Sequence, residues 1–317
     1  MRRAYALLLV PLLVLVAAVA GCGSSSPSTA NASTSVTVSG TFGKAPNVSI
    51  PAATASSSLY SKTVIQGSGA PLTSADSFVG NYAAYVWSGK THKLAMSTYT
   101  THTPSLFSGQ LLPGLSSALK GAKEGSRVLA VIPPKQGFGS SGNSQLGIKG
   151  TDTLVFVIDL VKTFSNTAGA TGAKVSAGGG ALPKVSAPVA GQAPTVTIPK
   201  GNPPKSLTVT PLLKGTGPAV AKGQAVVVQY TGVIWRTGKV FDSSWSRKMP
   251  FEFVDGANPE QVIPGWDKGL VGQTVGSRVM LTIPPADGYG KSGQSQAGIK
   301  GTDTLVFVVD ILGAVNP

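Results

Sequence analysis

The sequence has few of the residues that form disulfides, metal sites or acid–base pairs. Its 317 residues include one Cys, which excludes an intramolecular disulfide and a cysteine-based zinc site. The two His, His92 and His102, lack the spacing of a histidine metal motif. Only three Glu and nine Asp are available for carboxylate pairs. The sequence therefore predicts neither a bound metal nor a cofactor.

Charged residues are also scarce, at 12% of the chain, although 26 Lys and Arg against 12 Asp and Glu give a net charge of +14. This scarcity disfavours long surface helices and coiled coils, which are rich in Glu, Lys and Arg. With 42% hydrophobic residues, the chain does not have the composition of a disordered protein. At about 150 residues per domain, its length is typical of two domains.

The basic surplus is spread along the chain, and its longest runs are pairs such as Arg247 and Lys248. No basic stripe alternates with aromatic residues, so nucleic acid is a poor partner. Two interpretations fit the surplus equally well. One is a weak, salt-sensitive attraction to anionic lipids or wall polymers, and the other is solubility alone.

The N-terminus resembles an export signal. Arg2 and Arg3 precede an apolar stretch at 4–20, which is slightly short for a bilayer span and typical of a secretory signal peptide. Small residues then lead to the single Cys22, as in the lipobox of bacterial lipoproteins, where cleavage before the Cys accompanies its acylation. We therefore expect a signal peptide at 1–21 and an extracytoplasmic protein anchored to the cell membrane through a lipid on Cys22. An ordinary signal peptide or anchor helix with a chance Cys is the alternative.

The chain contains an internal repeat. Residues 147–157 recur without change at 298–308, which is 151 positions later. The pattern Pro-x-Val-x-Ile-Pro at 46–51 recurs at 194–199, which is 148 positions later. The second copy is therefore three residues longer in its middle. A unit of this length is a duplicated domain rather than a solenoid repeat.

Two segments frame the copies. Residues 22–45 are rich in Ser, Thr and Gly, and we expect a flexible spacer there. Residues 163–206 are rich in Ser, Ala, Gly and Pro and contain four Lys without an acidic residue, which predicts a semi-extended linker. The two domains would then span 46–162 and 207–317.

Within each copy the local signals favour strands. Residues 225–235 are β-branched and aromatic, and residues 277–283 alternate polar and apolar as in an antiparallel sheet. Residues 304–311 are typical of a buried closing strand. Between them, residues 264–272 begin with Pro and end with Gly, which predicts a short helix. These signals predict an α+β fold.

Motifs of the second copy resemble the FKBP-type peptidyl-prolyl cis–trans isomerases, in family order over about residues 207–317. They are Gln-Tyr-Thr-Gly at 229–232, Gly-Lys-Val-Phe-Asp-Ser-Ser at 238–244, Pro-Phe-Glu-Phe at 250–253, Val-Ile-Pro-Gly-Trp at 262–266 and Pro-x-x-Gly-Tyr-Gly at 285–290. The resemblance implies two tandem FKBP-like domains. In each, a bent antiparallel sheet would wrap one short helix around an apolar pocket.

The resemblance also implies roles for individual residues. Trp266 would form the floor of the pocket, and Ile299 would contact the residue before proline. The walls would be formed by Tyr230, Phe241, Phe251, Val262, Ile263 and Phe307. Gln261, where a Glu is common in the family, is a small departure.

The polar groups of this site would act on the peptide backbone. Tyr289 would offer its hydroxyl, and Ile263 its N–H, to carbonyls of the bound peptide. Asp242 would lie beside the prolyl carbonyl, oriented by Arg247 and the Tyr230 hydroxyl. Taken singly, each residue also has a structural interpretation, as core aromatics or as a surface ion pair, and it is their joint order that favours a site.

Such a pocket has a direct chemical use. Rotation about an Xaa–Pro amide is slow because resonance gives a barrier of about 18–20 kcal/mol. The planar amide is dipolar and stabilised by water, so an apolar enclosure disfavours it relative to the twisted transition state. Lowering the barrier by about 5–7 kcal/mol corresponds to roughly four to five orders of magnitude in rate. No nucleophile, metal or cofactor is required.

The first copy departs from this pattern. Leu115 stands at the position of Trp266, Phe138 stands at that of Tyr289, and residues 91–98 replace the Phe-Asp-Ser-Ser segment. We expect the first domain to keep the fold and to have weak or no isomerase activity, as a spacer, a substrate-holding module or a dimerisation surface. Slow turnover by an apolar pocket alone is the alternative.

Together these features predict an exported, lipid-anchored isomerase that assists folding of extracytoplasmic proteins through its second domain. Its partners would be proline-containing unfolded or secreted polypeptides, FKBP-directed macrolides and, through Cys22, the membrane. The rival hypothesis is a non-catalytic lipoprotein that holds unfolded chains in its pockets.

Overall fold

The structure is a computed structural model that describes residues 32–73, 76–176 and 182–316. The expected signal peptide and the expected lipidation site, Cys22, lie outside the described residues. None of the helices in the described part of the chain is long and apolar enough to cross a membrane.

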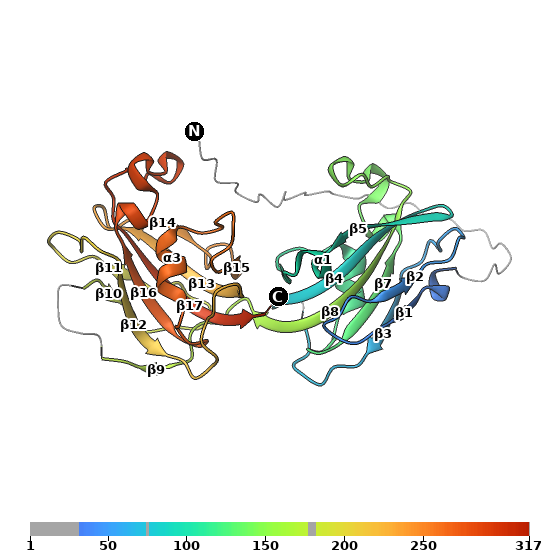
Figure 1. The fold of residues 1–317 in the computed structure, drawn as a ribbon, viewed down its shortest axis with the longest axis horizontal. Helices are drawn as coiled ribbons and strands as arrows, with labels where there is room; N and C mark the ends of the chain where they lie inside the picture. The colour runs from blue at the N-terminus through green and yellow to red at the C-terminus, as the bar shows by residue number, and fades with distance from the viewer. Residues whose placement is uncertain (1–31, 74–75, 177–181, 317) are drawn as a thin grey trace.

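Two antiparallel sheets form two domains that lie side by side (Figure 1). The first sheet has the strand order β3-β7-β8-β4-β5, and β6 also pairs with β4. Its strands are β3 (Tyr60–Ile65), β4 (Asp76–Ser88), β5 (Thr91–Ser97), β6 (Ser105–Phe107), β7 (Arg127–Ile132) and β8 (Thr153–Ser165). The helices of this domain are α1 (Thr98–Thr101) and α2 (Pro113–Leu119).

The second sheet repeats this arrangement with the order β14-β13-β17-β16-β12-β9, and β15 pairs with β13. Its strands are β9 (Ala173–Lys174), β12 (Thr208–Lys214), β13 (Ala225–Ile234), β14 (Val240–Ser243), β15 (Phe251–Val254), β16 (Arg278–Ile283) and β17 (Leu305–Val315). Its helix is α3 (Pro264–Leu270). Two tandem α+β domains, each with a sheet around a short helix, confirm the predicted fold class.

Each pocket helix packs closely on its sheet because it carries glycine where it meets a strand. A Cβ atom on Gly265 would lie 2.6 Å from Ile283 Cγ2, and one on Gly114 would lie 2.5 Å from Ile132 Cγ2. Each helix begins with proline, whose missing N–H costs nothing in the first turn. The main hydrophobic core of each domain lies between this helix and the sheet.

The connection before the last strand is also duplicated. In both copies it is built from three single-turn 3-10 helices, at 134–136, 139–141 and 144–146 in the first and at 285–287, 290–292 and 295–297 in the second. These positions are shifted by the same 151 residues as the sequence repeat. The connection therefore keeps its shape although several of its residues differ.

The two segments expected to be flexible or semi-extended instead contribute strands to β-hairpins that pack on the sheets. Strand β1 (Thr37–Ser39) of the expected spacer pairs with β2 (Asn47–Ser49), which lies just after that spacer, and β10 (Lys184–Val185) and β11 (Val196–Thr197) pair within the expected linker. Their apolar residues cover the face of each sheet that points away from the helix. The structure differs from the expectation because alternating Val and Ile residues in these Ser- and Gly-rich segments bury one side of each hairpin.

The repeated Pro-x-Val-x-Ile-Pro pattern belongs to these hairpins. Trp87 lies on the covered face of the first sheet, and its indole N–H donates to the carbonyl of Ala53 at 2.9 Å. Trp235 lies on the covered face of the second, and its indole N–H donates to the carbonyl of Gly201 at 3.2 Å. The duplicated unit therefore includes the hairpin that covers each sheet.

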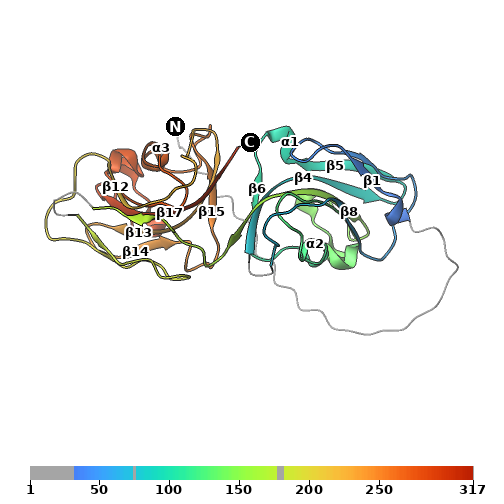
Figure 2. The same cartoon turned by 90° about the horizontal axis from the view of Figure 1, so that it is seen from below.

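The domains contact each other through strands that occupy equivalent positions, β6 and β15 (Figure 2). The backbone N–H of Leu106 donates to Oε2 of Glu252 at 2.7 Å. Val79, Phe164 and Val227 form a small apolar cluster beside this hydrogen bond. The other carboxylate oxygen of Glu252 is buried and has no hydrogen-bond partner among the described residues.

We expect the contact between the domains to weaken as the pH rises. Burial raises the pKa of Glu252 from 4.5 to about 7. Because its pKa is raised in the docked state, the Glu252 carboxyl contributes its full stabilisation of that state below pH 4.5. This stabilisation is lost as the pH rises through about 7. The difference is on the order of 3 kcal/mol. Small-angle scattering should show a more extended protein at pH 8.5 than at pH 5.5.

The matched control is Glu252→Gln, which keeps the size of the side chain and removes the titration. This variant should be equally compact at both pH values. A wild-type radius of gyration that does not change between pH 5.5 and 8.5 contradicts the prediction.

Candidate functional site

The candidate site of the second domain is centred on Trp266 of helix α3, which is 3% exposed. Tyr230 and Phe307 meet the indole ring edge-to-face, each with ring centroids 5.2 Å apart. Phe253 adds a third edge contact at 5.5 Å. Edge-to-face contacts of this kind fix ring orientation as well as burying apolar area. The aromatic set is therefore rigid before any ligand binds.

The remaining residues predicted to form the walls gather around this centre. Buried members of the same cluster include Ile263 and Ile299, and Phe241 meets Phe307 edge-to-face at 5.4 Å. Partly buried residues packed against the cluster include Phe241, Phe251, Val262 and Tyr289. The structure thus brings all the predicted apolar residues together, while their individual roles stay predictions.

Ile263 occupies the N-cap of helix α3. Its carbonyl accepts the N–H of Trp266 at 2.9 Å. The N–H of a residue at this position lies outside the hydrogen bonds of the helix. The geometry therefore suits the predicted donation from Ile263 to a peptide carbonyl at the edge of the site.

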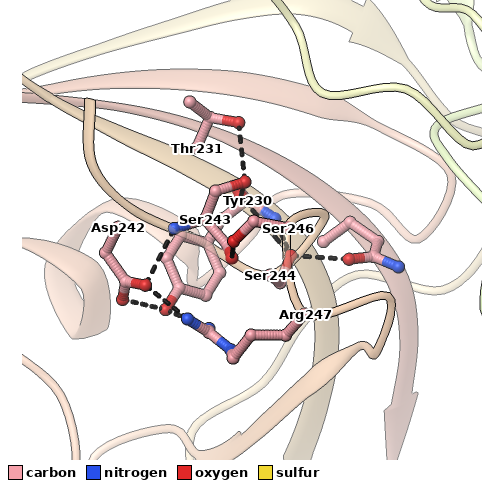
Figure 3. Close-up of polar contacts among 8 residues, drawn as sticks. Tyr230, Thr231, Asp242, Ser243, Ser244, Ser246 and Arg247 are labelled. Atoms are coloured by element: carbon pink, nitrogen blue, oxygen red, sulfur yellow. Dashed lines mark hydrogen bonds and ion pairs between the residues drawn. The ribbon is translucent and has the colours of Figure 1, made fainter. Parts of the chain in front are cut away.

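A charged cluster adjoins the aromatic residues through Tyr230, and Figure 3 shows its polar contacts. The Tyr230 hydroxyl and the Arg247 guanidinium both donate to the carboxylate of Asp242. Arg247 also donates to the Tyr230 hydroxyl at 2.8 Å. The backbone N–H of Ser243 donates to Asp242 at 2.8 Å. The carboxylate is held from several directions while its side chain stays 40% exposed, which leaves it able to face a ligand.

The electrostatics of the cluster keep Tyr230 and Arg247 each in one protonation state. Burial, and then the hydrogen bond to Asp242, raise the pKa of Tyr230 above its ordinary value of 10.0. The pKa of Arg247 is also raised, because its interactions with Tyr230 and Asp242 outweigh the cost of burial. Tyr230 is therefore a neutral donor and Arg247 a cation throughout the physiological range.

Supporting residues to which the sequence analysis gave no role lie behind the cluster. The N–H of Tyr230 donates to the Ser244 hydroxyl at 2.8 Å. Ser244 in turn contacts Gln229, whose side chain donates to the carbonyl of Asn166 at 3.0 Å. Phe253 shares a strand face with Phe251, and it could have been assigned to the site from its place in the Pro-Phe-Glu-Phe motif and its i, i+2 spacing from Phe251.

The first domain has the same framework with different side chains at the site. In the second domain Gly232 pairs with Asp242, and in the first the equivalent Ala84 pairs with Met96. Both strand pairs have a register shift next to this position. Met96 therefore stands where the second domain has its carboxylate.

Other wall positions of the first domain have also lost their rings. Ser105 is paired with β4 at the position where Phe251 is paired with β13. Leu115, which is buried, takes the place of Trp266. Thr98 keeps one supporting contact, because its hydroxyl accepts the N–H of Tyr82 at 2.8 Å. The framework is retained together with the rings of Tyr82 and Phe156, whereas the central indole and the carboxylate are not.

These replacements leave an open cleft of about 460 Å³ in the first domain. Its lining includes Tyr82 and Met96, at the positions of Tyr230 and Asp242. The rest of the lining is mainly short hydroxyl and aliphatic side chains: Leu94, Ala95, Ser97, Thr98, Thr100, Thr101 and Ser105. Leu94 and Met96 are 47% and 44% exposed, which is unusual for large apolar side chains.

Comparison with known proteins identifies the class that this fold and site define. The family model described as FKBP-type peptidyl-prolyl cis-trans isomerase matches residues 70–161 and 217–312, which is more than half of the chain. The chain therefore belongs to the FKBP-type peptidyl-prolyl cis–trans isomerases and contains their domain twice. This confirms the resemblance seen in the motifs of the second copy.

Relatives of known sequence match about one domain each. An FK506-binding protein of Streptomyces anulatus is 43% identical over 119 residues, which cover 38% of this chain and 94% of the relative. A probable FK506-binding protein of Corynebacterium glutamicum is 38% identical over 122 residues, which cover 38% of this chain and 98% of the relative.

Solved structures include the three FKBP domains of wheat FKBP73, with 22% identity and a TM-score of 0.33 over 82% of this chain and 95% of that one. FkpA from Escherichia coli has 38% identity and a TM-score of 0.31 over 35% of this chain and 48% of that one.

Proposed function

We propose that this protein is an exported, lipid-anchored isomerase that catalyses cis–trans isomerisation of Xaa–Pro bonds in its second domain. The observation that carries the proposal is the cluster of Asp242, Tyr230 and Arg247 beside the rings around Trp266. In the first domain the positions of Asp242 and Trp266 hold Met96 and Leu115.

The mechanism follows from this geometry. A prolyl ring that enters between the aromatic side chains leaves water, which destabilises the dipolar planar amide more than the twisted transition state. Asp242, fixed by Tyr230 and Arg247, lies at the rim, where it faces the prolyl carbonyl as that carbonyl rotates. Ile263 N–H and the Tyr289 hydroxyl hold the flanking carbonyls, so rotation is confined to one bond. These groups only orient the peptide and exclude water from it.

A matched pair of variants tests which domain is active. Tyr230→Phe removes the hydroxyl that fixes Asp242 and should lower kcat/KM for an Xaa–Pro peptide about tenfold, because a hydrogen bond to a charged group is lost. Tyr82→Phe makes the same change at the equivalent position of the first domain and should leave kcat/KM within twofold. The reverse pattern would assign the activity to the first domain.

The anchor is supported by the N-terminal sequence alone and is tested separately. Cys22→Ser removes the proposed acylation site. In a bacterial expression host, the wild-type protein should sediment with membranes, and the variant should lose the lipid mass and leave the membrane fraction. Membrane association that is unchanged in Cys22→Ser would contradict lipid anchoring and favour an uncleaved anchor helix.

A second function is favoured by the open cleft of the first domain. Its volume of about 460 Å³ and its exposed Leu94 and Met96 suit non-catalytic binding of apolar polypeptide segments. In this case the first domain holds a client while the second isomerises it. Suppression of client aggregation that persists in Tyr230→Phe would separate holding from catalysis.

A further inference from the structure

The loop between β15 and α3 is longer than the equivalent loop of the first domain. Ten residues separate Phe253 from Pro264, whereas five separate the equivalent Phe107 from Pro113. The second copy therefore has five additional residues at the entrance of the helix that carries Trp266.

This loop and the first turn of helix α3 gather carboxylates in a chain that has few of them. Three of the 12 acidic residues, Asp255, Glu260 and Asp267, line one cleft of about 350 Å³. Lys222 and Lys268 also line it, and Lys268 is paired with Asp287 at 2.6 Å. The cleft is thus a local negative site on a protein whose net charge is +14.

One of these carboxylates is unsatisfied in the protein alone. Asp255 is 1% exposed, and its Oδ2 atom has no hydrogen-bond partner among the described residues. Asp267, by contrast, accepts the backbone N–H of Gly256 at 3.0 Å. Burial, and then the nearby charge of Asp267, raise the pKa of Asp255 to about 7, although the charge of Lys222 opposes this rise without forming a hydrogen bond to Oδ2. A buried acidic group without a partner destabilises the protein, and a cationic ligand would supply the missing partner.

The cleft lies directly beside the proposed isomerase site. Pro264 and Asp267 line the cleft, and each follows a residue of the isomerase site, Ile263 and Trp266 respectively. Consecutive Cα atoms are about 3.8 Å apart, so both sites share the first turn of helix α3. A polypeptide that places its proline on Trp266 can therefore extend a flanking side chain to the cleft.

We infer that this cleft binds the ammonium or guanidinium group of a Lys or Arg side chain near the proline of a client polypeptide. The described residues contain no group of three or more His, Cys, Asp and Glu placed to hold a metal ion, so an organic cation is the better match. The inference rests on the proposed function, because it assigns a substrate preference to the same domain.

The test uses the intact chain and a set of neutral Xaa–Pro peptides in which one residue is changed to Lys, norleucine or Glu. The change is moved through the four positions on each side of proline, and affinity is measured by calorimetry at pH 8.5. At one position, Lys should bind about fivefold more tightly than norleucine, as expected for one partly exposed ion pair, and Glu should bind more weakly than norleucine.

Two variants locate this preference. Asp255→Asn and Glu260→Gln should each reduce the Lys preference to less than twofold, and Glu260 lies on an exposed loop where the change does not threaten folding. Glu124→Gln in the first domain changes the net charge equally and should keep the full preference.

Equal affinities for Lys and norleucine at every position would overturn the inference, as would a preference that survives both pocket variants or is lost in Glu124→Gln. If the neutral peptides bind but are not isomerised, the proposed function is wrong. The ratio of the Lys and norleucine affinities still tests this inference in that case.

Discussion

Trp266→Leu should lower kcat/KM for an Xaa–Pro peptide by about 10- to 100-fold, which corresponds to roughly 1.4–2.8 kcal/mol of transition-state stabilisation. The substitution gives the second domain the residue that the first domain has at this position, Leu115. It removes the ring that Tyr230 and Phe307 meet edge-to-face at 5.2 Å. Water then reaches the bound amide more easily, and the planar state regains its solvation.

Two controls separate this loss from a folding defect. Trp266→Phe keeps an aromatic ring and should retain more activity than Trp266→Leu. Near-ultraviolet circular dichroism and the midpoint of thermal unfolding report whether the domain is still folded at the assay temperature. If Trp266→Leu is folded and its kcat/KM is within twofold of wild type, the ring has no role in catalysis.

Asp310→Ala should destabilise the second domain by about 3–5 kcal/mol. Arg278 donates two hydrogen bonds to Asp310, at 2.6 and 2.8 Å, and both side chains are 2% exposed. Asp310 also accepts the backbone N–H of Ala170 from the segment before the domain, at 3.0 Å. Removing the carboxylate leaves a buried guanidinium without its counterion, which is far more costly than losing a surface pair. Urea unfolding followed by fluorescence measures the change.

The controls are a variant of an exposed ion pair and a double variant that removes both charges of the buried ion pair. Lys162→Met breaks an ion pair with Glu124 in which the lysine is 52% exposed, and it should cost less than about 1 kcal/mol. The double variant Arg278→Met, Asp310→Leu removes both buried charges and should recover most of the stability. A cost below about 1 kcal/mol for Asp310→Ala would show that the pair is not a structural element of the domain.

Much of the fold could be predicted because the two copies of the repeat can be compared within the chain. The unchanged segment at 147–157 and 298–308 showed the duplication. The short helix was predictable from Pro264, and the closing strand from its run of buried β-branched residues. The aromatic site was predictable only from the resemblance, since no periodicity shows that residues from β13, β14, β15, α3 and β17 meet.

The parts that could not be predicted depend on contacts between distant segments. The hairpins were missed because Val48 and Ile50 stand among Ser, Thr and Pro, and their burial becomes apparent only against the sheet. The position of Met96 opposite Ala84 depends on a register shift that the sequence does not show. The contact of Leu106 with Glu252 requires both domains in place.

The central claim is that the aromatic site around Trp266 receives the prolyl residue. It is tested most directly by the four tryptophan indole N–H signals in a nuclear magnetic resonance titration with an Xaa–Pro peptide. The indole nitrogen of Trp266 is buried and has no hydrogen-bond partner among the described residues, whereas Trp87 and Trp235 donate to backbone carbonyls on the covered faces of the sheets. The account predicts that the Trp266 signal shifts with peptide concentration while those of Trp87 and Trp235 stay in place. Saturable peptide binding that leaves the Trp266 signal unmoved would contradict it.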